Sequence, residues 1–291
     1  MSAPPAVIEV ADALSRHGYL PDEGLATAVY LAMRLRRPLL LEGEAGVGKT
    51  EVAKVLSRWT GGELIRLQCY EGIDAQQALY EWDYARQMLQ IRALSEHEVA
   101  DEDAVDALFG PKFLLERPLL DALRAGDGSV LLIDEIDRAD DEFEAFLLEL
   151  LSDFQITIPE IGTIRAETHP LVVLTSNRTR ELHDALKRRC LYHWVGYPGP
   201  EREVEIVVTR LPGIAEAIAR KVVAAVNRLR DLDLDKPPGV AETIDWVQTL
   251  TVLGVDDLDP STVEDSLGAV IKVRDDLDVV LEHLDELAVD G

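Results

Sequence analysis

The chain has 291 residues, of which 47% are hydrophobic, and its formal net charge is −26. A chain of this length can bury a core without disulfide or metal staples, and its acidic surface disfavours general nucleic-acid binding because it repels a phosphate backbone. No apolar run approaches the roughly 18 residues of a membrane span, and residues 1–5 lack the features of a signal peptide. The two cysteines, Cys69 and Cys190, are far apart and lie in no metal-ligand spacing, so they indicate neither a disulfide framework nor a zinc site. From these features together we expect a cytoplasmic protein with no integral membrane segment.

Acidic residues are concentrated at the C-terminal end of the chain. Residues 231–291 contain 17 Asp or Glu and three Lys or Arg, a net charge of −14. This composition indicates either a solvated helical face that keeps the protein soluble or a surface that docks to a basic partner.

The first part of the chain predicts helices followed by a strand–helix–strand unit. Residues 7–36 have helical periodicity with a break at residues 17–21. The apolar run 38–41 predicts a strand, and the helix that begins at Thr50 ends before Gly61. Residues 64–69 predict a second strand, and the short connection between the two strands indicates a parallel pair.

The segment between the first strand and its helix fits the pattern G-x-x-x-x-G-K-[ST]. It reads Gly43, Glu44, Ala45, Gly46, Val47, Gly48, Lys49, Thr50. In such a P-loop, backbone amides and the helix N-terminus cradle the phosphates of a nucleoside triphosphate. We expect Lys49 to reach the β- and γ-phosphates and the hydroxyl of Thr50 to bind Mg²⁺. An ordinary Gly-rich turn is the alternative, which the strand–loop–helix context disfavours.

Residues 70–128 have a less regular pattern, which predicts an insertion with two or three surface helices and a polar, acidic segment at residues 95–106. Residues 130–133 form a continuous apolar run, which is typical of a central parallel strand buried on both faces. It ends in two acidic residues, Asp134 and Glu135.

The next elements are an amphipathic helix after residue 140, with Asp140 as its N-cap, and a hairpin over residues 154–166. A buried strand at 171–175 leads to Asn177. A helix that ends in Lys187, Arg188 and Arg189 precedes the last strand, at 191–195. Beyond the turn residues at 196–200 the chain is predicted to be helical throughout, so we predict an α/β domain at 1–200, with the insertion at about 70–128, and a helical domain at 201–291.

Hydrolysis needs more than a phosphate cradle, and the chain offers candidates for each further role. Asp134 can hold Mg²⁺ directly or through water, and Glu135 beside it can polarise the attacking water. Asn177 can hydrogen-bond the γ-phosphate and the water, although Asn also commonly ends strands as a turn residue. Arg188 and Arg189 can supply positive charge, although cations also suit the C-terminal end of a helix.

This ordered set resembles the Walker A, Walker B, sensor 1 and arginine-finger series of AAA+ ATPases. The motifs are Gly43–Thr50, Val130–Glu135, Leu174–Asn177 and Leu186–Cys190. Within that superfamily the chain looks most like the MoxR group, through residues 41–43, 133–139, the hairpin around Ile158 and the long insertion. The combination of residues 134–138 with 187–194 looks closest to the MoxR-type ATPases that accompany carbon-monoxide-dehydrogenase-like molybdenum enzymes.

The resemblance implies a three-layer α/β domain with a central parallel sheet, an all-α C-terminal lid, and a ring of usually six subunits with ATP and Mg²⁺ between neighbours. It implies that Asn177 is sensor 1 and that Arg189 is the finger that acts on the ATP of the adjacent subunit, with Arg188 as the alternative. One position departs from the pattern, because Glu242 stands where a sensor 2 arginine is expected. Either another arginine serves or the lid is coupled to nucleotide differently.

Three functions are compatible with this resemblance. The first is an Mg-ATP-hydrolysing chaperone that acts with a von Willebrand factor A-domain partner and matures a client such as a molybdenum hydroxylase. The second is a nucleotide-gated assembly module with very slow turnover, which Glu135 disfavours and the absent sensor 2 arginine favours. The third is a DNA-remodelling AAA+ protein, which the net charge of −26 disfavours.

Overall fold

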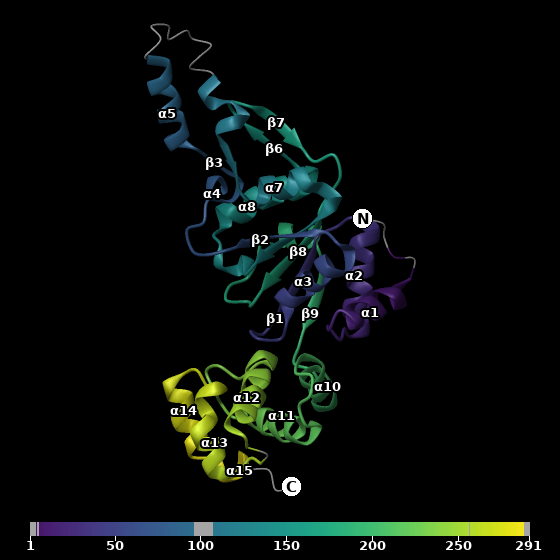
Figure 1. Cartoon of the computed structure of the whole chain (residues 1–291). Helices are drawn as coiled ribbons and strands as arrows, with labels where there is room; N and C mark the ends of the chain where they lie inside the picture. The colour runs from purple at the N-terminus through teal and green to yellow at the C-terminus, as the bar shows by residue number, and fades with distance from the viewer. Residues whose placement is uncertain (1–3, 5, 96–106, 256, 288–291) are drawn as a thin grey trace. The chain divides into compact units, whose positions relative to one another are not determined.

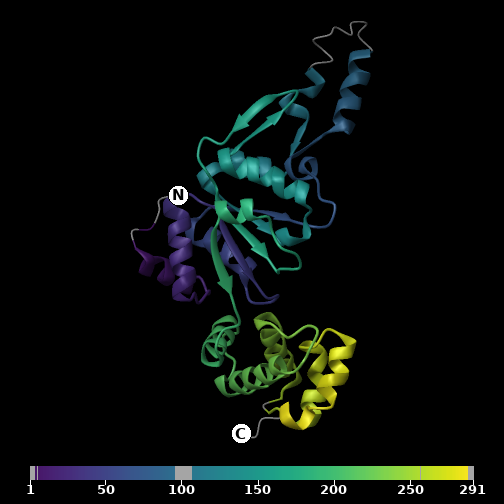
Figure 2. The ribbon, with the colours of Figure 1, turned by 180° about the vertical axis from the view of Figure 1, so that it is seen from behind.

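The computed structural model describes residue 4 and residues 6–95, 107–255 and 257–287. The chain forms two compact units, shown in Figures 1 and 2. The first contains residues 21–42, 52–95 and 107–193 together with the beginning of α1 (Val7–Arg16), and the second contains residues 14–20, 43–51 and the described residues from 194 onward.

The first unit is built on a five-stranded sheet with the order β2-β5-β8-β1-β9. These strands are β2 (Glu63–Gln68), β5 (Ser129–Asp134), β8 (Leu171–Ser176), β1 (Leu39–Gly43) and β9 (Leu191–Val195). The pairings β2–β5, β5–β8 and β8–β1 are parallel. Every residue of β1, β5 and β8 is buried, which confirms the predicted burial of the strands at 130–133 and 171–175.

The predicted pairing of the first two strands is wrong. The strands β1 and β2 belong to the same sheet, but β5 and β8 lie between them. The connection through α3 (Lys49–Thr60) is short, but a short connection can also join two strands of one sheet that are not neighbours. The strongly apolar strands β5 and β8 take two of the three interior positions, because residues there are covered on both faces.

Helices cover both faces of the sheet. One face packs against α4 (Ala75–Leu79), α7 (Pro118–Ala125), α8 (Asp141–Asp153) and α9 (Asp184–Arg189), whose apolar residues share a core with Leu40, Leu131 and Val172. Leu39 and Leu41 alternate with Leu40 and so point to the other face, where Figures 1 and 2 show α2 (Glu23–Leu35). This is the predicted three-layer α/β fold.

The segment 70–128 is less peripheral than predicted. A short antiparallel pair, β3 (Tyr80–Trp82) with β4 (Leu114–Glu116), was not predicted, and α5 (Tyr84–Ser95) follows β3. Helix α7 is wrongly predicted as a surface element, because Leu119, Leu120 and Leu123 are at most 2% exposed and pack in buried clusters. The acidic segment predicted at 95–106 lies outside the described residues after Ser95.

Two local predictions are confirmed in the same unit. Asp140 caps α8, since its side chain accepts from the amide of Phe143 at 2.9 Å. The hairpin consists of β6 (Gln155–Ile158) and β7 (Gly162–Arg165), which pair antiparallel.

The described residues from 200 to 287 form helices and their connections, as predicted. The helices are α10 (Pro200–Arg210), α11 (Glu216–Asp231), α12 (Val240–Leu253), α13 (Pro260–Ser266), α14 (Arg274–Leu281) and α15 (Leu284–Leu287). They share one apolar core around Trp246, which is fully buried and donates its indole N–H to Ser266 at 2.7 Å. The domain boundary at residue 200 stays a prediction, and the compact second unit also takes in residues 14–20 and 43–51.

Candidate functional site

The P-loop lies between β1 and α3, which is the predicted strand–loop–helix context. Gly43 allows close approach of another strand, because a Cβ there would lie 2.0 Å from the carbonyl oxygen of Val195. Gly48 has a φ of 94°, a backbone conformation that glycine adopts without steric cost. These two positions therefore require glycine for geometric reasons.

Lys49 is 6% exposed, and its ammonium group lies within its own loop. Its Nζ donates to the carbonyl oxygens of Gly43 at 2.8 Å and Glu44 at 2.5 Å. A buried ammonium group needs acceptors around it, and the loop supplies them from its backbone. The positive charge is thereby held inside the curve of the loop, where the sequence predicts the phosphates.

The start of α12 contacts the loop within the second unit. The amide of Ala241 donates to the carbonyl oxygen of Gly46 at 3.1 Å. Glu242, which stands where a sensor 2 arginine is expected, uses its carboxylate to accept the amide of Gly239 at 3.0 Å and so caps α12. Glu242 therefore has a structural role at the end of the helix that contacts the P-loop.

Asp134 ends β5 and is 2% exposed. Its Oδ1 accepts from the hydroxyl of Thr175 at 2.6 Å, and its Oδ2 accepts from Arg66 at 2.6 and 3.0 Å. The predicted magnesium ligand thus lies at the carboxyl end of β5, held from β8 on one side and from β2 on the other. Neither Thr175 nor Arg66 is among the residues predicted for the site.

Glu135 follows β5 in a left-handed backbone conformation with a φ of 55°. Such a conformation costs energy for a residue other than glycine. The amide of Glu135 donates to the Thr175 hydroxyl at 2.9 Å, while Oε2 accepts from Gln68 at 3.1 Å and from Arg138 at 3.2 Å. The strained turn points the carboxylate toward the side chain at the end of β2, away from the hydrogen bonds of Asp134.

Asn177 follows β8 directly and is partly buried. Among the described residues, its side chain makes no hydrogen bond or ion pair. The loop that carries it is fastened two residues later, where Asp137 Oδ2 accepts from the amide of Thr179 at 2.9 Å and from its hydroxyl at 2.7 Å. Asp137 is 2% exposed, so this link joins the turn after β5 to the turn after β8 inside the protein.

The predicted finger residues lie elsewhere in the unit, at the C-terminal end of α9. Arg189 donates from Nε to the hydroxyl of Ser152 at 2.7 Å. The Arg188 side chain is exposed and has no partner among the described residues. Arg37, just before β1, donates to the backbone of both arginines. The finger residues therefore lie at the amino-terminal edge of β1, whereas Asp134 lies at the carboxyl edge of the sheet.

Residues 38–190 match the AAA domain (dynein-related subfamily). The chain belongs to the AAA+ ATPase family. The matched segment covers more than half of the chain and includes every residue predicted for the site, from Gly43 to Arg189.

Two proteins of known sequence resemble this AAA+ chain. An uncharacterised protein of Staphylococcus haemolyticus is 23% identical over 258 residues, which are 84% of this chain and 90% of that protein. The chloroplastic chaperone protein ClpB3 of Arabidopsis thaliana is 27% identical over 179 residues, which are 60% of this chain and 15% of ClpB3.

Solved structures of Thermotoga maritima RuvB are also similar. A RuvB mutant has a TM-score of 0.48 at 18% identity, and the alignment covers 90% of this chain and 70% of that chain. The RuvB Holliday junction branch migration motor has a TM-score of 0.45 at 19% identity, with 84% and 66% covered.

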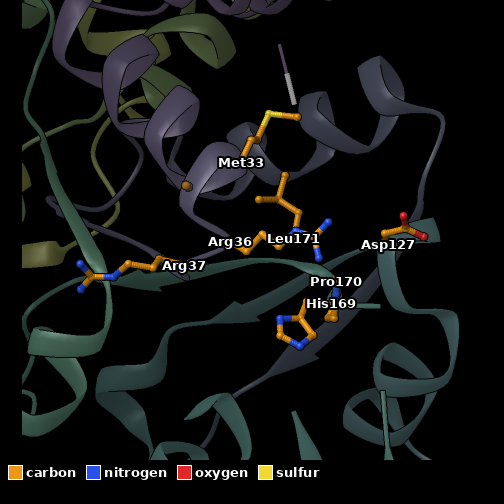
Figure 3. A pocket seen from close by; sticks show the side chains of 8 residues that line it. Met33, Arg36, Arg37, Asp127, His169, Pro170 and Leu171 are labelled. Carbon is orange, nitrogen blue, oxygen red and sulfur yellow. The ribbon is translucent and has the colours of Figure 1, made fainter. Parts of the chain in front are cut away.

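Two other features of the AAA+ unit carry no nucleotide chemistry. Burial raises the pKa of the Cys69 thiol, and of the Cys190 thiol, to about 12, so both remain protonated and unreactive near neutral pH. A pocket of about 40 Å³ beside Arg36 and His169, shown in Figure 3, is far smaller than the roughly 300 Å³ that small-molecule sites need.

In the part of the chain that the structure describes, no helix is long and apolar enough to span a bilayer.

Proposed function

We propose that this AAA+ protein binds Mg-ATP at its P-loop and hydrolyses it in a ring. Residues at the carboxyl ends of the strands of its sheet are proposed to bind the magnesium ion and the attacking water. The observation that carries the proposal is the pair Asp134 and Glu135, whose carboxylates leave one strand end with different hydrogen-bond partners. Glu42 in β1 is in register with Ser176, one residue before Asn177, and the P-loop begins directly after Glu42. This connectivity supports the proposal that the P-loop and the acidic pair act on one nucleotide.

The residues available fit Mg-ATP. A hydroxyl on Thr50 and a carboxylate on Asp134 are the oxygen ligands that Mg²⁺ prefers. When bound, the ion neutralises charge that develops on the phosphates. Lys49 binds the β- and γ-phosphates, Glu135 accepts a proton from the attacking water, and Asn177 orients that water.

The finger is proposed to act on the neighbouring subunit. Strand β1 spans about 15 Å at the usual rise per residue, and the α9 end and the Asp134 edge lie at its opposite ends. A guanidinium that far from its own site completes hydrolysis only across a subunit interface, as a head-to-tail ring provides. Arg189 is the proposed finger, and Arg188 is the alternative whose guanidinium has no described partner.

A chaperone of the MoxR type is the proposed biological role, with a hexameric ring, a von Willebrand factor A-domain partner and a molybdenum hydroxylase as client. Support comes from the motif resemblance and from the likeness to a chaperone, ClpB3. The acidic C-terminal region suits a basic face on a partner, and it disfavours DNA as the substrate. The alternative of a slow assembly module draws support from Glu242, which caps α12 in place of a sensor 2 arginine.

The first experiment compares phosphate release and ATP affinity in three variants. We expect Lys49→Ala to lose ATP binding, whereas Glu135→Gln should bind ATP and lose at least about 100-fold in turnover. Glu142→Gln is the matched control, because it changes an exposed glutamate on α8. Equal phosphate release by the wild type, Lys49→Ala and Glu135→Gln would end the ATPase proposal.

A second experiment addresses the finger and the client. Arg189→Ala should leave ATP affinity nearly intact while most turnover is lost, and a collapse of ATP affinity with unchanged oligomer size would refute the assignment. ATP-loaded Glu135→Gln should retain a purified molybdenum hydroxylase or A-domain protein. Retention of DNA alone, weakened steeply by salt, would favour the DNA-remodelling alternative.

A further inference from the structure

Helix α9 is only six residues long (Asp184–Arg189), and it ends in three consecutive basic residues. The last carbonyl groups of a helix lack partners within the helix. In α9 the amide of Cys190 donates to the carbonyl oxygens of Leu186 and Lys187, at 3.3 and 3.2 Å. The carbonyl oxygens of the next three residues in the chain need hydrogen-bond donors from outside the helix.

The side chain of Arg37 supplies all three partners. Its Nε donates to the carbonyl oxygen of Arg189 at 3.1 Å, and Nη2 donates to those of Arg188 and Cys190 at 2.7 and 3.1 Å. A planar guanidinium presents its donors in a fixed fork, which an ammonium group cannot reproduce. One side chain thus holds the backbone of both arginines that the sequence offers as a finger.

The backbone of Arg37 is itself fixed. Arg36 closes α2 in a left-handed conformation with a φ of 52°, and the amide of Arg37 donates to the carbonyl oxygen of Ala32 at 3.2 Å. The carbonyl oxygen of Pro38 accepts from the amide of Leu191 at 2.8 Å, which joins the start of β1 to the start of β9. Arg37 is among the residues that line the pocket in Figure 3, where its side chain extends away from Arg36 and His169. The contact with α9 is therefore anchored on both sides of Arg37.

We propose that Arg37 is a positioning residue for the arginine finger, because it fixes the direction in which Arg188 and Arg189 project toward the nucleotide of the neighbouring subunit. The inference rests on the trans hydrolysis proposed above. Arg37 lies at the opposite end of β1 from its own P-loop, so its effect passes through α9 to the next subunit. If the finger is displaced by about 1 Å, the rate of hydrolysis falls by up to about 100-fold, even though ATP still binds.

The variant Arg37→Ala tests this inference in the full chain. We expect kcat to fall about 10- to 100-fold, with KM and the affinity for a non-hydrolysable ATP analogue unchanged within about twofold. Arg37→Lys keeps the charge and loses the fork, so its kcat should be intermediate. Arg34→Ala is the matched control, since it removes an exposed arginine from the last turn of α2, and it should behave as the wild type.

Mixed rings separate a role in trans from a role in the subunit's own site. Glu135→Gln subunits have intact α9 and can donate a finger to an Arg37→Ala neighbour. In a random 1:1 ring half of the subunits carry the inactive Glu135→Gln site, and about half of the remaining Arg37→Ala sites face a neighbour with an intact finger. The mixture should therefore release phosphate at about a quarter of the wild-type rate. Without rescue, a tenfold defect at every Arg37→Ala site would leave about one-twentieth of the wild-type rate.

The mixture has three informative outcomes. The inference is supported if Glu135→Gln subunits restore the rate of the Arg37→Ala mixture as they restore that of the Arg188→Ala or Arg189→Ala mixture. Recovery with a finger variant but not with Arg37→Ala would overturn it and leave the proposed function intact. Absence of recovery with both finger variants would instead remove the trans arrangement itself. Should Arg37→Ala fail to fold, Arg37→Lys is carried through the same mixtures and decides in the same way.

Discussion

A buried ion pair in the helical unit offers a quantitative test of how that unit is held together. The guanidinium of Arg230 in α11 donates to both carboxylate oxygens of Glu203 in α10, at 2.6 and 2.8 Å. The two side chains are 8% and 0% exposed. Glu203 also accepts from the hydroxyl of Thr243 in α12 at 2.6 Å, and Arg230 donates to the carbonyl oxygen of Pro238 at 2.8 Å. The pair thus joins three helices.

Removal of one partner should be costly, because it leaves a buried charge without its counterion. We expect Arg230→Ala to lower the free energy of unfolding by about 3–5 kcal/mol. The guanidinium also lies 4.4 Å from the ring centroid of Tyr197, a contact worth about 0.5–2 kcal/mol that is lost at the same time. The double variant Arg230→Met with Glu203→Leu should recover most of the loss, since replacing a buried pair by apolar groups is often neutral.

Urea unfolding followed by tryptophan fluorescence measures these differences, with the fully buried Trp246 as a reporter in the same core. Arg220→Ala is the matched control on the same helix. Arg220 also bridges two glutamates, Glu201 and Glu216, but its side chain is 49% exposed and should leave the unfolding midpoint unchanged. Equal losses for Arg220→Ala and Arg230→Ala would refute the argument from burial.

Three further predictions concern the first unit. Arg66→Ala removes a cation that competes with Mg²⁺ for the carboxylate of Asp134, so half-maximal ATP binding should need about two- to fivefold less Mg²⁺ in a titration with fluorescent ATP. Thr179→Val deletes the hydroxyl bond to buried Asp137; calorimetry should show a loss of about 1–3 kcal/mol and kinetics a lower kcat at unchanged KM. Asp140→Ala removes the cap of α8 and should cost about 1 kcal/mol in urea unfolding with ATP affinity unchanged.

The parts of the fold that local rules govern could be predicted from the sequence. The P-loop is a contiguous pattern with its strand and helix on either side, and the cap of α8 depends on Asp140 and the residues just after it. The order of the strands could not be predicted, because it depends on which strands pair, and paired strands such as β1 and β8 are more than a hundred residues apart in the sequence. For this reason the prediction that β1 and β2 are neighbours is wrong, and two strands separate them.

The residues around the acidic pair were missed for the same reason. Arg66 and Gln68 alternate with buried Ile65 and Leu67 along β2, so they share one face of that strand. That pattern was visible in the sequence. Its meaning depends on the pairing of β2 with β5, which places Gln68 in register with Asp134. A polar residue on a strand becomes a candidate for the site only once the neighbouring strand is known.

The basic run at residues 34–37 shows how side chains of one type take separate tasks that composition cannot distinguish. As a sequence it indicates the end of a helix, where cations suit the negative dipole. In the structure Arg34 is an exposed residue of the last turn, Arg36 closes the helix with a left-handed backbone, and Arg37 reaches a helix end more than 150 positions away. Because its partners are backbone carbonyls, no residue type at the far end reveals the contact. If the mixed-ring experiment gives the expected recovery, the rate at one subunit's nucleotide depends on a side chain that its neighbour uses to fasten a six-residue helix.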